Sequence, residues 1–262
     1  MGDVIHTLPA AAALAPVDWL IKPRWAPLLE GNPHVQRVIT EPGWRTHAVA
    51  YDFQGLLKSA WLARRAAPQV YGFRTPREWP AHWFYTHLRE RPDGHVVDQN
   101  RALAGSDRPA QFDLPPGRPE GHLPAGRFVL ASPAAGWGAK EWPAEYWAEL
   151  RRRLPIPLVL NGPPGSGLDH ESTLPGLIYA TRKAAAIVGV DSGPLHLAAA
   201  LQKPGVAIFG PTDPVRNGPY GGTIRVLRAP DAVTSYRRRS TTAASMRAIT
   251  PALVAAALEE LL

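Results

Sequence analysis

The sequence has no cysteine among its 262 residues. This absence excludes disulfide bonds, thiol nucleophiles and thiolate metal sites, and it suits a protein of a reducing compartment. Long apolar runs are missing too, because none reaches the roughly 18 residues that a membrane-spanning helix needs. No charged segment followed by an apolar one marks a signal peptide at the N-terminus. We therefore expect a cytoplasmic protein that does not span a membrane.

Patterns for metal ions and for nucleic acid are also absent. The chain has no Asp-x-Asp pair, no histidine cluster and no basic-aromatic RNA motif. Lys and Arg number 29 against 22 Asp and Glu, which gives a net charge of +7. That balance favours an anionic partner, such as a phosphorylated sugar or an acidic membrane face, over nucleic acid. We expect no metal ion and no cofactor.

What the chain does have is an alternation of strand and helix patterns, with 45% apolar residues to fill two cores. Pro and Gly concentrate from Asp107 to Gly126, which is typical of a domain boundary. We expect an α/β protein with one domain over residues 1–124 and a second over residues 125–262 that ends in a helix.

The stretch from Ala186 to Gly222 has the pattern of strand, turn, helix, strand and polar loop. Ile187–Val190 and Val206–Phe209 are short apolar runs, typical of buried parallel strands. Ligands of such sheets bind beyond the carboxyl ends of the strands, and a helix N-terminus near Gly193 suits a phosphate. The residues expected at this edge are Asp191, Ser192, Gly193, His196, Gly210, Pro211, Thr212 and Asp213. An ordinary strand–helix–strand unit with a core histidine at position 196 is the alternative.

A second loop of small residues follows the expected strand Arg127–Ala131 and runs to Lys140. Backbone N–H groups in such a loop can approach a phosphate closely, and the ammonium group of Lys140 would reach the same phosphate. Ala135 and Gly136 belong to this expected site. The alternative is that Lys140 is an ordinary surface lysine in front of the next helix.

The N-terminal half begins with apolar residues at helical spacing, so we expect a helix that starts at Gly2 or Asp3. Asp3 is then either an N-cap or a general base. Residues 71–87 mix aromatic and basic side chains. One interpretation is a rim that touches a membrane surface or a lipid-linked sugar, with its arginines on phosphates and carboxylates. The other is a hydrophobic cap on the sheet, which we expect for most of the aromatic residues, and we expect the rim for Arg74 and Arg77.

The remaining patterns complete the expected secondary structure. Further strands are expected at 17–21, 35–39, 48–53, 158–160 and 223–227, and helices at 56–66, 97–104, 143–153, 181–186 and 252–262. Residues 161–167 are expected to be a flexible connection, and the basic run Tyr236–Arg239 a solvated face.

Several motifs resemble those of glycosyltransferase family 9, the ADP-heptose transferases that build the inner core of lipopolysaccharide. Asp-Ser-Gly-x-x-His-x-x-Ala at 191–199 is followed by Gly-Pro-Thr-Asp-Pro at 210–214, and Lys-x-Trp-Pro lies at 140–143. Asp-x-Gln-Gly-Leu-x-Lys-Ser-Ala at 52–60 is similar to the heptosyltransferase I branch. Gly-Asp-x-x-His-x-x-Pro at 2–9 matches the start of the family, except that the strand which precedes it there is missing.

The resemblance implies a GT-B fold, in which two Rossmann-like domains with parallel sheets face a central cleft. It implies an inverting, metal-independent transfer of heptose from ADP-heptose to Kdo-lipid A. Asp3 would be the general base and Lys140 would neutralise the leaving diphosphate. Donor contacts would come from Ala135, Gly136, Lys140, Asp191, Ser192, Gly193, His196 and Gly210 to Asp213, and acceptor contacts from Asp3, His6, Gln54, Gly55, Lys58, Arg74, Arg77 and Arg101.

The partners implied are a nucleotide-sugar donor, a lipid-linked acidic sugar and the inner face of the cytoplasmic membrane, with the protein acting as a peripheral monomer. Glu171 is a candidate contact to the donor ribose or adenine, in a region shorter than in the family. The alternatives are a related transferase with another donor or acceptor, and a truncated, non-catalytic protein that binds a nucleotide sugar.

Overall fold

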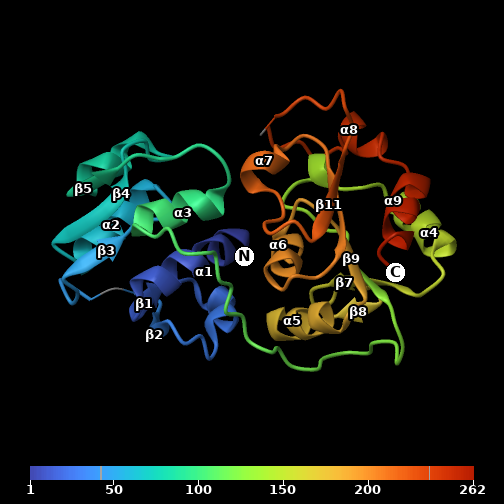
Figure 1. The fold of residues 1–262 in the computed structure, drawn as a ribbon, viewed down its shortest axis with the longest axis horizontal. Coiled ribbons are helices and arrows are strands. Elements are labelled where there is room, and N and C mark those ends of the chain that lie inside the picture. Colours follow the sequence, from blue (N-terminus) through green and yellow to red (C-terminus); the bar gives the residue numbers. More distant parts are fainter. Residues whose placement is uncertain (42, 236) are drawn as a thin grey trace. The chain divides into compact units, whose positions relative to one another are not determined.

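The computed structural model describes residues 1–41, 43–235 and 237–262, so Tyr236 of the basic run lies outside the described residues. The chain divides into two compact units, shown in Figure 1. Asp3–Pro115 forms the N-terminal unit, and Pro116–Leu262 together with Met1 and Gly2 forms the C-terminal unit.

The division falls inside the Pro- and Gly-rich segment, ahead of the boundary expected at residue 124. The first residues after Pro115 belong to the C-terminal unit because they bond to it. The Arg118 amide donates to the Pro175 carbonyl at 3.1 Å, and the Glu120 carboxylate accepts from the Thr173 amide at 2.7 Å. Gly117 has a φ of +74° there, a backbone conformation that favours glycine.

The C-terminal unit is built on one six-stranded parallel sheet with the order β11-β10-β9-β6-β7-β8. Its strands are β6 (Val129–Ser132), β7 (Leu158–Gly162), β8 (His170–Glu171), β9 (Ala186–Val190), β10 (Gly205–Phe209) and β11 (Ile224–Arg228). β6, β9 and β10 are buried at every position, as expected for central parallel strands covered on both faces.

Helices cover both sides of this sheet (Figure 1). They are η3 (Gly138–Lys140), α4 (Ala144–Arg153), α5 (Leu174–Lys183), α6 (Gly193–Ala200), α7 (Pro214–Asn217), α8 (Ala244–Arg247) and α9 (Pro251–Glu259). Trp147 of α4 and Leu258 of α9 pack into one core cluster with strands β6, β9 and β10. The Trp142 indole N–H donates to the Ile249 carbonyl at 2.8 Å, so this large side chain is buried with its polar atom satisfied.

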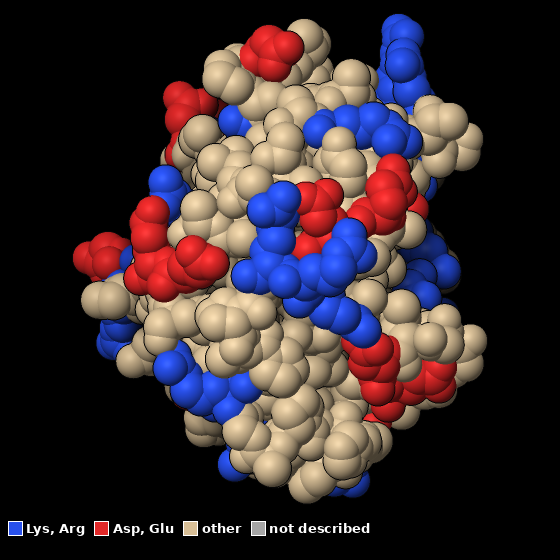
Figure 2. Space-filling view, turned by 90° about the vertical axis from the view of Figure 1, so that its right-hand side faces the viewer, with Lys and Arg blue, Asp and Glu red and all other residues tan. Residues whose placement is uncertain are grey.

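The side of the C-terminal unit that carries α4 and α9 has mixed charge, as Figure 2 shows. Ion pairs there include Arg153–Glu149 at 2.6 Å, Arg225–Glu260 at 2.8 Å and Arg247–Glu145 at 3.6 Å. Exposed pairs of this kind contribute little to stability, and they leave no broad field of one sign to attract an anion.

The N-terminal unit holds two parallel sheets instead of one. Strands β1 (Val17–Leu20) and β2 (Val35–Ile39) form the first, and β3 (Val49–Tyr51), β4 (Gln69–Phe73) and β5 (His87–Arg89) form the second. Its helices are α1 (Gly2–Leu14), η1 (Pro23–Leu29), α2 (Leu57–Ala66), η2 (Trp79–Phe84) and α3 (Val96–Ala104). Within the described residues, none of the helices of either unit is long and apolar enough to cross a bilayer.

Helix α1 begins at Gly2, as predicted, and it is tied to α3. The Asn100 side-chain amide donates to the His6 carbonyl at 3.2 Å and to the Thr7 hydroxyl at 3.1 Å. Leu8 packs with Ile21 in the core beneath β1. The helix therefore has an anchored, mostly buried face, and Asp3 in its first turn stays exposed.

One expected helix was wrong in its bounds. The helix expected at 181–186 is α5, which begins at Leu174 and ends at Lys183, and Ala186 already belongs to β9. Pro175 suits the first turn of α5, a signal that the apolar pattern further along the chain obscured. The connection expected at 161–167 is present from residue 163 onward, although Asn161 and Gly162 still belong to β7.

The hydrophobic cap expected from the aromatic residues at 71–87 was also wrong for two tryptophans. Trp79 and Trp83 lie on η2 with 62% and 74% of their surface exposed. η2 is held by the fully buried Ala81. The stretch also contains β4 and β5, which the mixed aromatic and basic pattern concealed.

Candidate functional site

Three loops of the C-terminal unit meet at one edge of its sheet. Asp191 follows β9, the loop Gly210–Asp213 follows β10, and the segment that leads to Lys140 follows β6. β9 pairs with β10 on one side and with β6 on the other, and all three are parallel. Their carboxyl ends therefore lie side by side, which is the position of ligand sites in open α/β sheets.

A buried ion pair joins two of these loops. The Lys140 ammonium lies 2.9 Å from Asp191 Oδ2, and the two side chains are only 9% and 11% exposed. His196 Nε2, one turn into α6, lies 3.8 Å from Asp191 Oδ1. Burying two charges costs desolvation energy that their attraction offsets only in part, so such a pair is weak as a stabilising device. Its position at the strand ends indicates a binding role.

Buried polar groups without partners surround this pair. The hydroxyls of Ser192 and Thr212 and the indole N–H of Trp137 are buried, and none has a hydrogen-bond partner among the described residues. A buried hydroxyl left unpaired costs on the order of 1–3 kcal/mol, so native proteins usually satisfy it with a ligand or water. Ser192 is also the N-cap of α6 and makes no side-chain capping bond. These groups suit a ligand rich in oxygen atoms at a helix N-terminus.

Trp137 and Arg238 are site residues that the sequence did not identify. The Lys140 ammonium lies 4.1 Å from the centre of the Trp137 ring, and the Arg238 guanidinium lies 5.6 Å from it. The backbone of Arg239 holds this arrangement, since its carbonyl accepts from the Ala139 amide at 3.0 Å. The described residues of the basic run that ends at Arg239 are exposed, as expected of a solvated face, and Arg238 contacts the Trp137 ring from that position.

The loop after β10 is held in place by hydrogen bonds from β11 and from the segment that follows β11. Arg228, the last residue of β11, donates to the Gly210 carbonyl at 3.2 Å, and the Ser235 amide donates to the Pro211 carbonyl at 2.7 Å. The Asp213 side chain accepts from the Val215 amide at 2.9 Å and so caps the short helix α7. Asp213 thus has a structural role besides any contact to a ligand.

Glu171 closes its own loop. Its carboxylate accepts from the amides of Gly165 at 2.8 Å and Gly167 at 2.5 Å, and these hydrogen bonds lower the pKa of Glu171. The side chain is therefore held as a charged group at the end of β7. Its contact to a ribose or adenine stays a prediction.

A second polar cluster lies in the N-terminal unit, after β3. The buried Asp52 carboxylate accepts from the Gln54 amide at 2.9 Å, the Ser59 hydroxyl at 2.9 Å and the Tyr85 hydroxyl at 2.7 Å. Burial raises the pKa of Asp52, and these hydrogen bonds act against that rise. Burial also raises the pKa of Tyr85, and the nearby negative charge of Asp52 raises it further. Asp52 thereby fixes the turn that presents Gln54 and starts α2.

This turn packs tightly against the loop before η2. Gly55 has a φ of +66°, and a Cβ placed on it would lie 2.8 Å from the Arg77 backbone nitrogen. The Glu78 amide donates to the Gly55 carbonyl at 2.8 Å. Gln54, Lys58 and Arg77 are exposed around this contact. The structure therefore brings four of the expected acceptor residues together.

Of the other four expected acceptor residues, Asp3 is exposed in the first turn of α1, and the remaining three contact residues of the N-terminal unit. Arg74 forms an ion pair with Glu90, and Arg101 forms one with Asp98 at 2.8 Å. His6 is buried, and its ring packs edge-on against a second histidine, His95, at 5.4 Å between ring centres. The acceptor roles of these three residues stay predictions.

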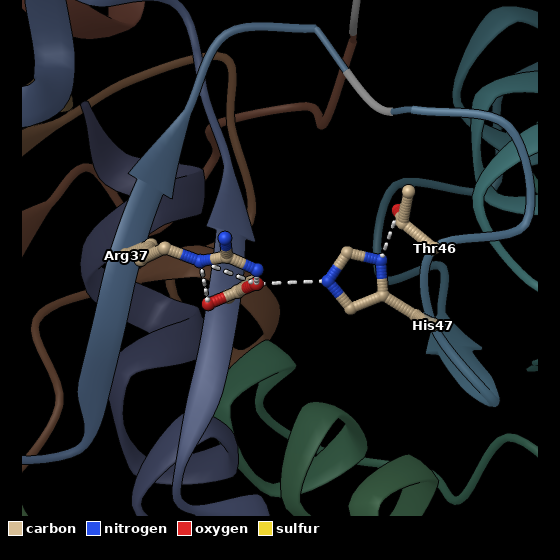
Figure 3. Close-up of polar contacts among 4 residues, drawn as sticks. Arg37, Thr46 and His47 are labelled. Carbon is tan, nitrogen blue, oxygen red and sulfur yellow. Dashed lines mark hydrogen bonds and ion pairs between the residues drawn. The ribbon is translucent and has the colours of Figure 1, made fainter.

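A further cluster, drawn in Figure 3, joins the two sheets of the N-terminal unit. The Asp18 carboxylate on β1 accepts from Arg37 Nε on β2 at 3.0 Å and contacts His47 Nε2, just before β3, at 2.8 Å. Thr46 Oγ1 lies 2.9 Å from His47 Nδ1 on the far side of that ring. The hydrogen bonds of Arg37 and then of His47 lower the pKa of Asp18. We interpret this cluster as a structural link.

Solved structures identify the class of protein. E. coli heptosyltransferase WaaC with ADP matches with a TM-score of 0.78 at 26% identity, over 100% of this chain and 97% of that one. E. coli ADP-heptose lps heptosyltransferase II matches with a TM-score of 0.79 at 23% identity, over 99% and 95%. The fold is thus that of the GT-B glycosyltransferases, as the sequence predicted.

Sequence comparison gives the family. The model of glycosyltransferase family 9 (heptosyltransferase) matches residues 44–155 and 169–246. Lipopolysaccharide heptosyltransferase 1 of Pseudomonas aeruginosa is 31% identical over 84% of this chain and 79% of its own length. The protein of the same name from Escherichia coli K12 is 30% identical over 88% and 91%. The chain belongs to glycosyltransferase family 9 and is a heptosyl-transferring glycosyltransferase, which confirms the predicted family and enzyme class.

Proposed function

We propose that this enzyme transfers heptose from ADP-heptose to Kdo-lipid A, as a step in building the inner core of lipopolysaccharide. The observation that carries the donor half is the Lys140–Asp191 pair at the common edge of β6, β9 and β10. The names of the relatives support the sugar and the pathway, since they are lipopolysaccharide heptosyltransferases, and one solved neighbour holds ADP-2-deoxy-2-fluoro heptose.

The donor diphosphate would lie at the start of α6. There the N-terminal end of the eight-residue helix, with its dipole, favours negative charge. The unpartnered Ser192 and Thr212 hydroxyls would donate to diphosphate or sugar oxygens. Lys140 would stabilise the charge that develops as ADP leaves, a role in which a fixed cation in a dry site is effective.

The chemistry would be a single displacement with inversion. An acceptor hydroxyl oxygen attacks the anomeric carbon of heptose, the bond from that carbon to the diphosphate breaks, and ADP departs with the bonding electrons. Asp3, exposed in the first turn of α1, would take the proton of the hydroxyl. Lys58 and Arg77 beside the Gln54 turn would bind the acidic acceptor sugar. We propose that no metal ion takes part.

A transfer assay tests the proposal directly. The full chain is incubated with ADP-heptose and Kdo-lipid A, and the product is followed by mass spectrometry. We expect the acceptor mass to rise by one heptosyl residue and ADP to be released in equal amount. Activity with another sugar nucleotide and none with ADP-heptose would overturn the donor assignment, and transfer to a heptosylated acceptor alone would overturn the acceptor assignment.

A further inference from the structure

The N-terminal unit exposes large apolar side chains on two elements that pack against each other. On α2, Leu57 is 43% and Trp61 48% exposed, and on η2, Trp79 is 62% and Trp83 74% exposed. Leu57 and Trp61 are four residues apart, so they lie on the same side of α2. We call these four residues the tryptophan surface.

Hydrogen bonds and packing join α2 and η2 at this surface. The Leu57 amide donates to the Glu78 carboxylate at 2.8 Å, and Glu78 directly precedes Trp79. α2 and η2 also pack against each other. Monomeric proteins seldom expose several large apolar residues on adjoining elements, and where they do, the patch usually contacts a partner or a membrane.

Tryptophan is the side chain best suited to the boundary between lipid and water, because its ring is apolar and its N–H is polar. Such residues on one side of a helix are typical of proteins that lie on a bilayer surface without crossing it. A protein interface also favours tryptophan. The charges around the tryptophan surface distinguish between the two.

Basic residues flank the tryptophan surface. Lys58 and Arg65 are exposed on α2, and Arg77 is exposed just before η2. The Arg65 guanidinium lies 5.9 Å from the centre of the Trp61 ring, so it is held close to the apolar patch. The Glu78 carboxylate is engaged at the start of α2. Each basic group near an anionic bilayer contributes on the order of 1 kcal/mol of attraction, so this pattern favours anionic phospholipid.

From these observations we infer that the tryptophan surface docks the enzyme on a bilayer that contains anionic phospholipid. Leu57, Trp61, Trp79 and Trp83 enter the headgroup region, and Arg65 contacts lipid phosphates. The inference deepens the proposed function and rests on it for one point, the lipid-linked nature of the acceptor. The turn at Gln54 that begins α2 would then face a substrate held in the same membrane.

Vesicle sedimentation tests the docking without any acceptor. The full chain is mixed with vesicles of phosphatidylethanolamine and phosphatidylglycerol, and separately with vesicles of phosphatidylcholine alone. We expect binding to the anionic vesicles only, weakened by added salt. The double variant Trp79→Ser/Trp83→Ser should bind roughly tenfold more weakly or worse, and Arg65→Gln should lose part of the salt dependence.

The matched control is Leu253→Ser, which removes another exposed apolar side chain from α9 of the C-terminal unit and should bind vesicles as the wild type does. Thermal unfolding followed by circular dichroism should be unchanged in the double variant, because both side chains are exposed. Equal vesicle binding by wild type and double variant would overturn the docking. So would a wild-type dimer that the double variant dissociates, because the occupant would then be a second copy of the chain.

The two proposals fail in different ways. Because the vesicles contain no Kdo-lipid A, their binding does not depend on the reaction. Transfer to a soluble acceptor without lipid chains should be equal in wild type and double variant. Normal transfer without vesicle binding would overturn the docking alone, and vesicle binding without transfer would overturn the proposed function alone.

Discussion

At the scale of single residues, the donor site rests on side chains that are expensive to bury. Lys140 and Asp191 are 51 positions apart in the chain, yet they form a contact with little exposure to water. Two apolar side chains of the same size in place of this pair would often be as stable or more stable, whereas replacing only one partner would leave a buried charge unpaired. The unpartnered hydroxyls of Ser192 and Thr212 add to this cost. These buried groups therefore lower the stability of the unliganded protein, and a charged, oxygen-rich ligand that bonds to them would raise it.

Two glycines with the same backbone conformation allow a test of whether the packing of the Gln54 turn matters for acceptor binding. Gly55 and Gly31 both have a φ of +66°, but a Cβ would meet the Arg77 backbone at Gly55 and nothing within 4 Å at Gly31. Gly31→Ala should cost about 1 kcal/mol of unfolding free energy through backbone strain alone. Gly55→Ala should cost clearly more and should raise the KM for the acceptor, because the Gln54 turn must shift.

Denaturant unfolding and steady-state kinetics check this expectation. Gly31→Ala serves as the control for strain and should leave both KM values unchanged. If the two variants lost the same stability and Gly55→Ala kept its acceptor KM, the packing of this turn against Arg77 would have no bearing on the acceptor.

At the scale of elements, Asp18 joins sheets that share no strand pairing. β1 and β2 form one sheet and β3 belongs to another, and the Asp18 carboxylate contacts both Arg37 and His47 (Figure 3). Asp18 has a pKa below its ordinary value of 3.8 in the folded protein. Its contribution to stability is therefore present above pH 3.8 and is lost as the pH falls through the lower, folded value.

The expected result is that Asp18→Asn is less stable than the wild type at neutral pH and that this difference narrows as the pH falls below 3.8. The measurement is the denaturant midpoint as a function of pH, recorded for both proteins. Asp107→Asn, which changes an exposed carboxylate of the same unit, should follow the wild-type curve. A constant difference at every pH would show that Asp18 acts through packing and not through its charge.

At the scale of the whole molecule, the expected donor and acceptor residues separate by unit. All expected donor residues lie in Pro116–Leu262, and all expected acceptor residues, Asp3 included, lie in Asp3–Pro115. Binding of the nucleotide and removal of the acceptor proton would therefore be separable functions. Asp3→Asn should lower kcat by at least about a hundredfold and leave the Kd for ADP within twofold of the wild type.

Single-turnover transfer and calorimetric titration with ADP measure the two quantities. Asp107→Asn is again the matched control, since it removes a carboxylate from the same unit without touching α1. Full activity in Asp3→Asn would assign the base to another residue. A large loss of ADP affinity would place Asp3 in the donor site instead.

Much of the C-terminal unit could be predicted from the sequence, because buried parallel strands are continuous apolar runs and end at Gly, Pro or Asp. The runs that became β9 and β10 are of this kind, and the polar residues that follow them lie at one edge of the sheet, as expected. The strands β4 and β5 could not be predicted, because Tyr71 and His87 sit among aromatic and basic residues without a clear period. Their pairing depends on β3, which lies far away in the sequence.

The sequence by itself determined the family, the alternation of strand and helix and the residues at the strand ends, because these follow from local patterns of apolar, glycine and proline residues. Only the tertiary structure decided which of those residues meet. It placed Lys140 on Asp191, brought Arg238 to Trp137, buried His6 and left Trp79 and Trp83 in water. Contacts of this kind depend on which strands are neighbours in a sheet, and that arrangement is a property of the whole folded unit.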